Sequence, residues 1–89
     1  MAKKYLLVLI EEQELFRSGL RAMAMPDIQL EVVGSSSNCS DGLRLVEQLR
    51  PDLVLMDLST YGSQGIKTIG QIKRSDRRVK ILALTSHRS

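Results

Sequence analysis

The sequence predicts an α/β protein with a mostly parallel sheet and helices on both faces. Three observations support this fold class. Apolar runs alternate with segments whose apolar residues recur every three or four positions, in the order βαβαβαβ. The most apolar run, residues 53–57, ends in the single acid Asp57, and a segment rich in Ser and Gly follows it. The chain has 89 residues, which is enough for one domain with one core.

Hydrophobic period and helix-breaking residues place the elements of the first half. Residues 5–10 predict a strand, and residues 13–25 predict a helix that Pro26 ends. Residues 28–34 predict a second strand. The next four residues, 35–38, are three serines and an asparagine, which predict a loop that offers helix caps.

The second half continues this alternation. Residues 40–50 predict a helix whose apolar side chains recur at intervals of three, namely Leu43, Val46 and Leu49. Residues 53–57 predict a strand buried on both faces, followed by a loop through Gln64. The next helix carries three isoleucines on one side, Ile66, Ile69 and Ile72, and residues 80–85 predict the last strand.

Composition excludes several classes of protein. Hydrophobic residues make up 43% and charged residues 26%, so the chain is not disordered on composition. Cys39 is the only cysteine, so no disulfide can form within the chain, which indicates a reducing compartment. The apolar run near the start is too short for a signal-peptide core or a membrane span. These features predict a cytoplasmic protein without a membrane partner.

The net charge of +3 is weak support for a nucleic-acid partner. The basic residues gather only at Lys73, Arg74, Arg77, Arg78 and Lys80, without interleaved aromatic residues. This pattern favours a solvated helix end and loop. The chain also lacks a Gly-rich phosphate loop, which disfavours a nucleotide site.

Acidic residues follow two of the predicted strands. Asp57 ends the buried strand, where open α/β sheets place their chemistry, and Glu11 and Glu12 directly follow the first strand. If the strands are neighbours, three carboxylates meet at one edge and require a cation, and hard oxygen ligands suit Mg²⁺ or Mn²⁺. Such an ion could hold a phosphoryl group for attack by Asp57, and the hydroxyl of Thr85 could contact a transferred oxygen.

Each of these residues also has a structural explanation. Asp57 could be a strand-end turn residue, and Glu11 and Glu12 could be a solvated first helix turn, stabilised by the helix dipole. Thr85 could be an ordinary β-branched strand residue. Cys39, expected in an exposed loop, is more often inert than a redox sensor. No role is assigned to His87.

Five segments carry a family resemblance: Val8-Leu9-Ile10-Glu11-Glu12, residues 15–21, Glu31-Val32-Val33-Gly34, residues 50–58 and Ile81-Leu82-Ala83-Leu84-Thr85. With them the chain resembles the receiver domain of bacterial two-component response regulators, most closely the LuxR-type (NarL/FixJ-like) subgroup. The resemblance implies a flavodoxin-like doubly wound parallel sheet with strand order 2-1-3-4. Residues 1–89 would then be a receiver domain that is incomplete at its C-terminus.

The resemblance also implies site roles. Asp57 would be the phosphoacceptor for a histidine kinase, and Thr85 the switch hydroxyl. Mg²⁺ would be held by Glu11, Glu12, Asp57 and the backbone carbonyl of Ser59. Phosphorylation would repack one face and change partner binding, with DNA bound only through an effector domain outside this chain. Such a domain is not an enzyme, apart from catalysing its own phosphorylation and dephosphorylation.

The chain departs from the receiver pattern at several positions. Glu12 stands where Asp is usual, Asn38-Cys39 where Asp-Gly or Asn-Gly is common, and Thr60-Tyr61-Gly62 where Met-Pro-Gly is usual. Gln64 replaces the usual Asp. Without the proline, the loop after Asp57 is expected to be less stiff.

Receivers also continue with a fourth helix, a fifth strand that begins with a lysine, and a fifth helix. The sheet of the 89 residues would therefore have an open apolar face and edge. We expect a fragment, natural or engineered, or a chain that covers this face in a homodimer. The alternative function is an atypical, phosphorylation-independent receiver that serves for dimerisation or protein docking. A metal-dependent phosphatase is disfavoured, because Ser59 stands where a second acid would be needed.

Overall fold

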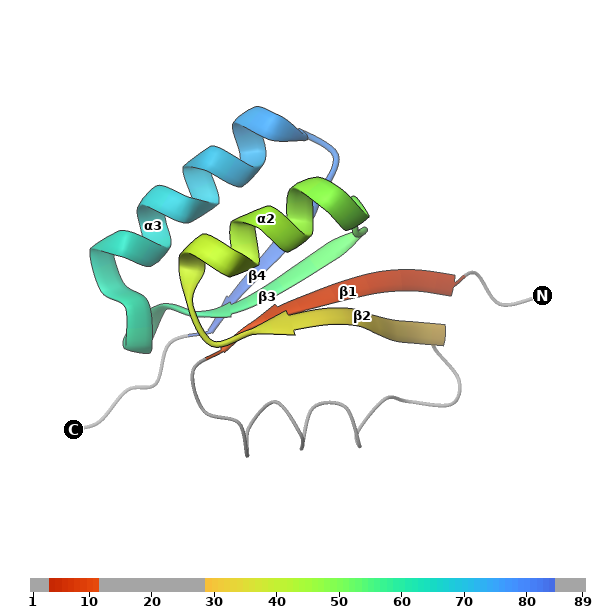
Figure 1. Ribbon diagram of the computed structural model, residues 1–89, viewed down its shortest axis with the longest axis horizontal. Coiled ribbons are helices and arrows are strands. Elements are labelled where there is room, and N and C mark those ends of the chain that lie inside the picture. The colour runs from red at the N-terminus through yellow and green to blue at the C-terminus, as the bar shows by residue number, and fades with distance from the viewer. Residues whose placement is uncertain (1–3, 12–28, 85–89) are drawn as a thin grey trace.

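The computed structural model describes residues 4–11 and 29–84, which form a parallel sheet with two helices on one face (Figure 1). The strands are β1 (Lys4–Ile10), β2 (Gln29–Ser36), β3 (Leu53–Asp57) and β4 (Lys80–Leu84), and the helices are α2 (Cys39–Leu49) and α3 (Leu58–Ser75). The strand order is β2-β1-β3-β4 and every pairing is parallel, which confirms the predicted order 2-1-3-4.

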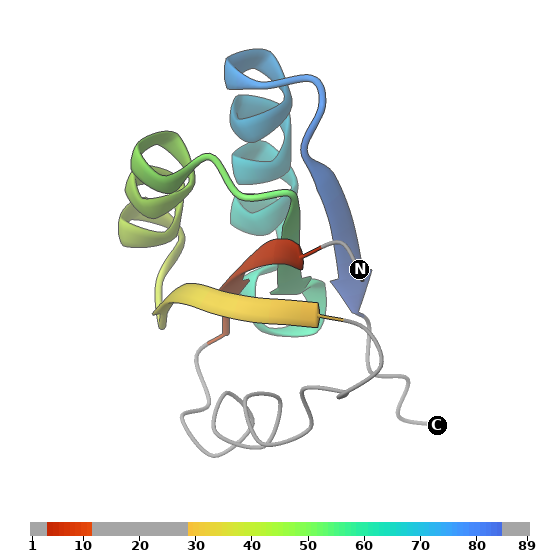
Figure 2. The ribbon, with the colours of Figure 1, turned by 90° about the vertical axis from the view of Figure 1, so that its right-hand side faces the viewer.

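Helices α2 and α3 lie side by side over the sheet (Figure 2). The helix predicted over residues 13–25 lies outside the described residues, so the prediction of helices on both faces is confirmed for one face. No helix in the part of the chain that the structure describes is long and apolar enough to cross a membrane.

The core has two layers because side chains of a strand alternate between faces. The layer under the helices holds Val8, Ile10, Val46, Val54, Met56, Ile72 and Val79. The opposite layer holds Leu7, Leu9 and Leu55. In β3 the three consecutive residues Val54, Leu55 and Met56 are all buried, which confirms that this strand is covered on both faces.

Strand β2 is longer than the sequence predicted. Ser35 and Ser36 were expected in a loop, but they extend the strand and pair with Leu9 and Ile10 of β1. The pairing register shifts between Leu7 and its successor, as in a β-bulge. Main-chain pairing with a buried neighbour therefore outweighs the weak strand propensity of serine.

Helix α2 begins one residue earlier than predicted. Asn38 caps it, with its Oδ1 accepting from the main-chain N–H of Asp41 at 2.8 Å. The helix ends at Leu49, and the next residue, Arg50, adopts a left-handed conformation with φ 46°. Cys39 is the first helical residue and is buried, so the prediction of an exposed loop cysteine is wrong.

The buried stripe of α2 also differs from the predicted one. Cys39, Gly42 and Val46 are buried, whereas Leu49 is 38% exposed. The reason is the close approach of the helix to the sheet at Gly42, where the absent side chain leaves room for Ile10.

Helix α3 begins directly after Asp57, so the predicted loop through Gln64 is wrong. Its first turn is separated from the rest by a kink at Gly62, whose φ of 55° and ψ of −129° are non-helical. Past the kink the buried residues are Gly65, Thr68 and Ile72, while Ile66 is 63% exposed. A Cβ at Gly65 would lie 2.9–3.2 Å from Leu58, Tyr61 and Met56, and this close contact turns the Gly65 side inward.

The basic cluster lies at the end of α3 and in the turn that follows, as predicted, and its last member, Lys80, begins β4. Lys73 reaches across this turn, and its Nζ donates to the carbonyl oxygens of Arg77 and Val79. The other members of the cluster are exposed: Arg74, Arg77, Arg78 and Lys80. Strand β4 forms one edge of the described sheet, and its Leu82 is 52% exposed.

Candidate functional site

Asp57 ends β3 and caps α3, so its carboxylate lies at the carboxyl edge of the sheet. The main-chain N–H of Ser59 donates to Oδ1 of Asp57 at 2.9 Å, and the Ser59 hydroxyl donates to the same oxygen. The hydroxyl of Thr60 donates to Oδ2 at 3.2 Å. The first turn of α3 thus surrounds the carboxylate with donors, which is the usual chemistry of a helix N-terminus.

Glu11 directly follows β1 and is 3% exposed. Its main-chain N–H donates to the carbonyl oxygen of Ser36 at 2.9 Å, which holds it against the end of β2. Because β1 pairs with β3 up to Ile10 opposite Met56, the two acids emerge at the same edge. The Glu11 side chain lies close enough to the Asp57 carboxyl to lower its pKa, in agreement with the predicted proximity of the two acids.

Two neighbouring carboxylates repel one another unless a cation lies between them or one of them is protonated. The two carboxylates are hard oxygen donors of the kind that Mg²⁺ and Mn²⁺ prefer, so the donor set fits such an ion. Elsewhere in residues 4–11 and 29–84, as here, no three His, Cys, Asp or Glu side chains gather in a group that could hold a metal.

Partial burial raises the pKa of the Asp57 carboxyl, but hydrogen bonds lower it by more. The donors are the Ser59 hydroxyl and main-chain N–H and the Thr60 hydroxyl, and the Glu11 side chain lowers the pKa further. The net result is a pKa below the ordinary value of 3.8. Asp57 is therefore ionised at neutral pH and can act as a nucleophile without a general base.

The turn between β2 and α2 forms the third side of the site. The hydroxyl of Tyr61, in the first turn of α3, donates to the carbonyl oxygen of Ser37 at 2.9 Å. The turn borders an open hollow of about 480 Å³, lined by Ser35, Ser36, Ser37, Asp41, Arg44 and Leu45. The sequence singled out Tyr61 only as a replacement for proline, because nothing local identifies a partner 24 residues away.

The segment predicted to be a less stiff loop is thus a helical turn that Asp57 caps and Tyr61 ties to the neighbouring turn. Ser59 lies beside Asp57 through its N–H and hydroxyl, and its predicted role as a carbonyl ligand stays a prediction. Glu12 and Thr85 lie outside the described residues, so their predicted roles also stay predictions.

Comparison with known proteins gives a consistent family. A model of the response regulator receiver domain matches residues 7–89. The transcriptional regulatory protein LiaR of Bacillus subtilis (strain 168) is 46% identical over 81 residues, and the nitrate/nitrite response regulator protein NarL of Escherichia coli (strain K12) is 29% identical over 83 residues. The matches cover 89% and 91% of this chain but only 37% and 38% of those proteins.

A solved structure shows the same fold. The crystal structure of a LuxR-family two-component response regulator from Aurantimonas sp. SI85-9A1 aligns with a TM-score of 0.84 and 26% identity. The alignment covers 98% of this chain and 62% of that chain. The chain is thus similar to the receiver part of proteins that are considerably longer.

Proposed function

The chain belongs to the receiver domain family of LuxR-type two-component response regulators, and on this premise we propose that Asp57 accepts a phosphoryl group from a histidine kinase. The observation that carries the proposal is the pairing of Asp57 with Glu11 at the carboxyl edge of the sheet. The carboxylate is ionised, partly exposed and surrounded by donors, as an acceptor of this kind requires.

The hydrogen bonds of the two carboxylate oxygens of Asp57 indicate which of them attacks the phosphoryl group. Oδ1 accepts two hydrogen bonds from Ser59, whereas Oδ2 accepts a longer one from Thr60, so Oδ2 is the less firmly held oxygen and the expected attacking atom. Oδ2 forms a bond to phosphorus as the P–N bond of the phosphohistidine breaks, and the histidine nitrogen keeps the electron pair. The product is an acyl phosphate on Asp57 and a free imidazole on the kinase.

Glu11 and Asp57 are the described residues that would hold Mg²⁺, and the resemblance adds Glu12 and the Ser59 carbonyl. When bound, the ion supplies positive charge that offsets the charge of the phosphoryl group. Glu11 is held by the end of β2, and Ser59 orients the Asp57 carboxylate. We propose that the domain acts as a switch and not as an enzyme, with Thr85 as the switch hydroxyl.

The output of such a switch lies outside these residues. LiaR is a transcriptional regulatory protein, and the chain corresponds to 37% of its length. We propose that DNA is reached through an effector domain that the 89 residues do not contain. We expect that a homodimer which repacks on phosphorylation links the receiver domain to this effector domain.

The alternative is a docking or dimerisation module that works without phosphorylation. Leu82 is 52% exposed on β4, at one edge of the described sheet. An exposed apolar side chain on a strand at the edge of the sheet is suited to contact with another chain or with a further part of the same chain. This surface could serve either function, so the chemistry at Asp57 decides between them.

Intact mass spectrometry before and after incubation with acetyl phosphate and Mg²⁺ tests the proposal. We expect the parent chain to gain one phosphoryl group and Asp57→Asn to gain none. Asp52→Asn is the matched control, because Asp52 flanks the opposite end of the same strand, and this variant should gain the group like the parent. A folded parent chain that gains no mass would leave the docking module as the better function.

A further inference from the structure

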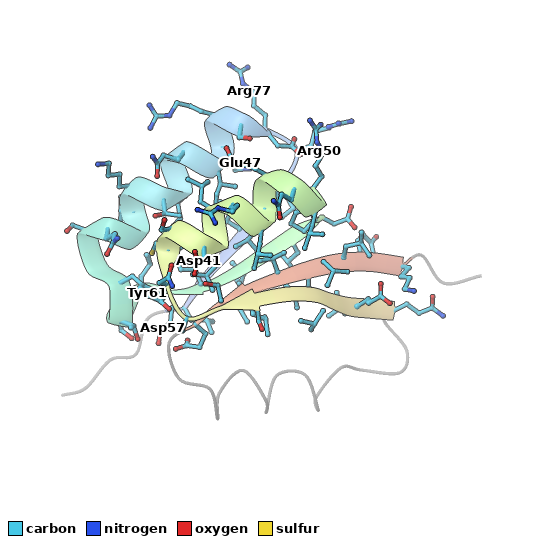
Figure 3. The ribbon with its side chains drawn as sticks, in the orientation of Figure 1. Asp41, Glu47, Arg50, Asp57, Tyr61 and Arg77 are labelled. Atoms are coloured by element: carbon cyan, nitrogen blue, oxygen red, sulfur yellow. The ribbon has the colours of Figure 1, made fainter. Side chains whose placement is uncertain are left out.

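Tyr61 connects two segments that are distant in sequence. It is half-buried at the end of the first turn of α3, where its ring packs against the helix-side core. Its hydroxyl donates to the Ser37 carbonyl oxygen at 2.9 Å. Figure 3 shows Tyr61 and Asp57 at the same end of the molecule, with Arg50 and Arg77 at the other. The hydrogen bond therefore ties the turn that carries Asp57 to the turn between β2 and α2.

The end of β2, directly before this turn, holds Glu11. The main-chain N–H of Glu11 donates to the Ser36 carbonyl oxygen at 2.9 Å. The turn is stiffened from within, because the Ser36 hydroxyl donates to the Asn38 carbonyl oxygen at 2.9 Å and accepts from the Asn38 N–H at 3.1 Å. Residues 36–38 are thus a common support: they hold Glu11 through the main chain and the Asp57 turn through Tyr61.

The C-terminal side of the Asp57 turn offers less support. Gly62 follows Tyr61 with φ 55°, and no atom lies within 4 Å of the position that a Cβ would take there. On its inner side Tyr61 is packed, since a Cβ at Gly65 would lie 3.1 Å from the Cβ of Tyr61. Tyr61 is thus packed on its inner side and the chain bends immediately after it, so its hydroxyl is placed to anchor the turn.

We propose that Tyr61 is a positioning residue: its hydrogen bond to Ser37 sets the separation of the Asp57 and Glu11 carboxylates and so the affinity of this pair for a divalent cation of the Mg²⁺ or Mn²⁺ type. Releasing the hydroxyl lets the Asp57 turn move relative to Glu11. The cation then binds more weakly, because its oxygen ligands must be brought together at a cost in conformational entropy. The inference rests on the proposed function, since it concerns the same pair of acids.

Binding of Mn²⁺ to the whole chain tests the inference without any phosphoryl transfer. The Mn²⁺ dissociation constant is measured from the electron paramagnetic resonance signal of the free ion for the parent and for Tyr61→Phe. We expect a rise of about three- to tenfold in the variant, as for the loss of one hydrogen bond of ordinary strength. Tyr5→Phe is the matched control, because the chain has two tyrosines and Tyr5 lies at the opposite end of β1 from the site. It should bind like the parent.

A second readout separates positioning from loss of structure. With acetyl phosphate as donor, Tyr61→Phe should need more Mg²⁺ for its half-maximal rate of phosphorylation, while the rate at saturating Mg²⁺ changes less. If Tyr61→Phe does not fold, Ser36→Ala replaces it, because it loosens the same turn and leaves Tyr61 in place. The same direction of change in Mn²⁺ affinity is expected.

The outcomes distinguish this inference from the proposed function. Unchanged Mn²⁺ affinity in Tyr61→Phe, or in Ser36→Ala where it is the substitute, overturns the role of Tyr61. If the parent chain is nevertheless phosphorylated, the phosphoacceptor proposal stands. A parent chain that binds no Mn²⁺ overturns both the role of Tyr61 and the assignment of a metal to the two acids.

Discussion

Gly42 of α2 rests directly on Ile10 of β1: a Cβ atom at Gly42 would lie 2.6 Å from both Cγ1 and Cδ1 of Ile10. Ile10 is fully buried, so its side chain has little room to give way. Glu11 is the next residue along the chain. The contact therefore sets how closely α2 and its capping turn approach the strand end that carries one of the two site acids.

Gly42→Ala is expected to destabilise the fold. Overpacking of a filled core costs about 1–3 kcal/mol and alanine brings about 1 kcal/mol to a helix interior, so the net loss is up to about 2 kcal/mol. Gly70→Ala is the matched control, because a Cβ there would meet only Arg74 Nη2 at 3.7 Å. Urea denaturation should show a lower midpoint for Gly42→Ala and an equal or higher one for Gly70→Ala. Equal shifts in both variants would contradict the packing argument.

Gly62→Ala is expected to lower stability by about 1–3 kcal/mol for a different reason. Nothing lies near the position of the added methyl group, so the cost comes from the backbone, which at φ 55° and ψ −129° is unfavourable for an L-residue. D-alanine at this position, introduced by chemical synthesis, is the control. The mirror image of these angles is ordinary extended backbone, so the D-residue should be tolerated. Equal melting temperatures for the L-alanine and D-alanine variants would disprove this explanation.

Asn38→Ala removes the N-cap of α2 and should cost about 0.5–2 kcal/mol. The side chain accepts from the N–H of Asp41 at 2.8 Å and donates to the Asp41 carboxylate at 3.0 Å. Asn38→Ser keeps a capping oxygen, and most of the stability should return. The stabilities of the two variants and the parent are compared by urea denaturation. The comparison requires that the unfolding free energy falls with urea concentration at the same slope in all three. A serine variant no more stable than the alanine variant would show that the cap is not the cause.

The pKa of Asp57 is expected to lie below 3.8 in the folded chain, as measured by carbon-13 NMR of its carboxyl group during a pH titration. A lowered pKa means that the hydrogen bonds to the carboxylate contribute stability above the ordinary value. This contribution is lost as the pH falls from 3.8 through the lower folded value. Between pH 5 and 8 the charge of Asp57 is constant, so it should add no inflection to the rate of phosphorylation.

Ser59→Ala is the variant that tests the cause of the lowered pKa. It removes the hydroxyl bond to Oδ1 and keeps the main-chain bond, so the pKa of Asp57 should rise toward 3.8. Ser63→Ala, which changes an exposed serine beyond the kink, should leave the pKa as it is in the parent. If the pKa of Asp57 is the same in Ser59→Ala as in the parent, neighbours other than the Ser59 hydroxyl lower it.

The pattern of apolar residues along the chain was enough to predict the four strands and the position of Asp57 at the end of β3. The apolar run that ends at Asp57 identified β3, because a strand buried on both faces needs apolar residues at every position. The placement of Glu11 beside Asp57 needed one further premise, that β1 and β3 are neighbours, because parallel strands end at a common edge only where they share a sheet. The family resemblance implied that strand order, and the pairing of Ile10 with Met56 confirms it.

Only the tertiary structure decided which sides of the helices face inward and what holds the Asp57 turn. The regular spacing of leucines and isoleucines placed Leu49 and Ile66 on the apolar sides of their helices, but close approach at Gly42 and Gly65 turns neighbouring positions toward the sheet and leaves these two exposed. The contact of Tyr61 with Ser37 joins turns 24 residues apart. Which residues become buried depends on how closely the helices and the sheet pack, and this packing is set only when the elements come together in the folded chain.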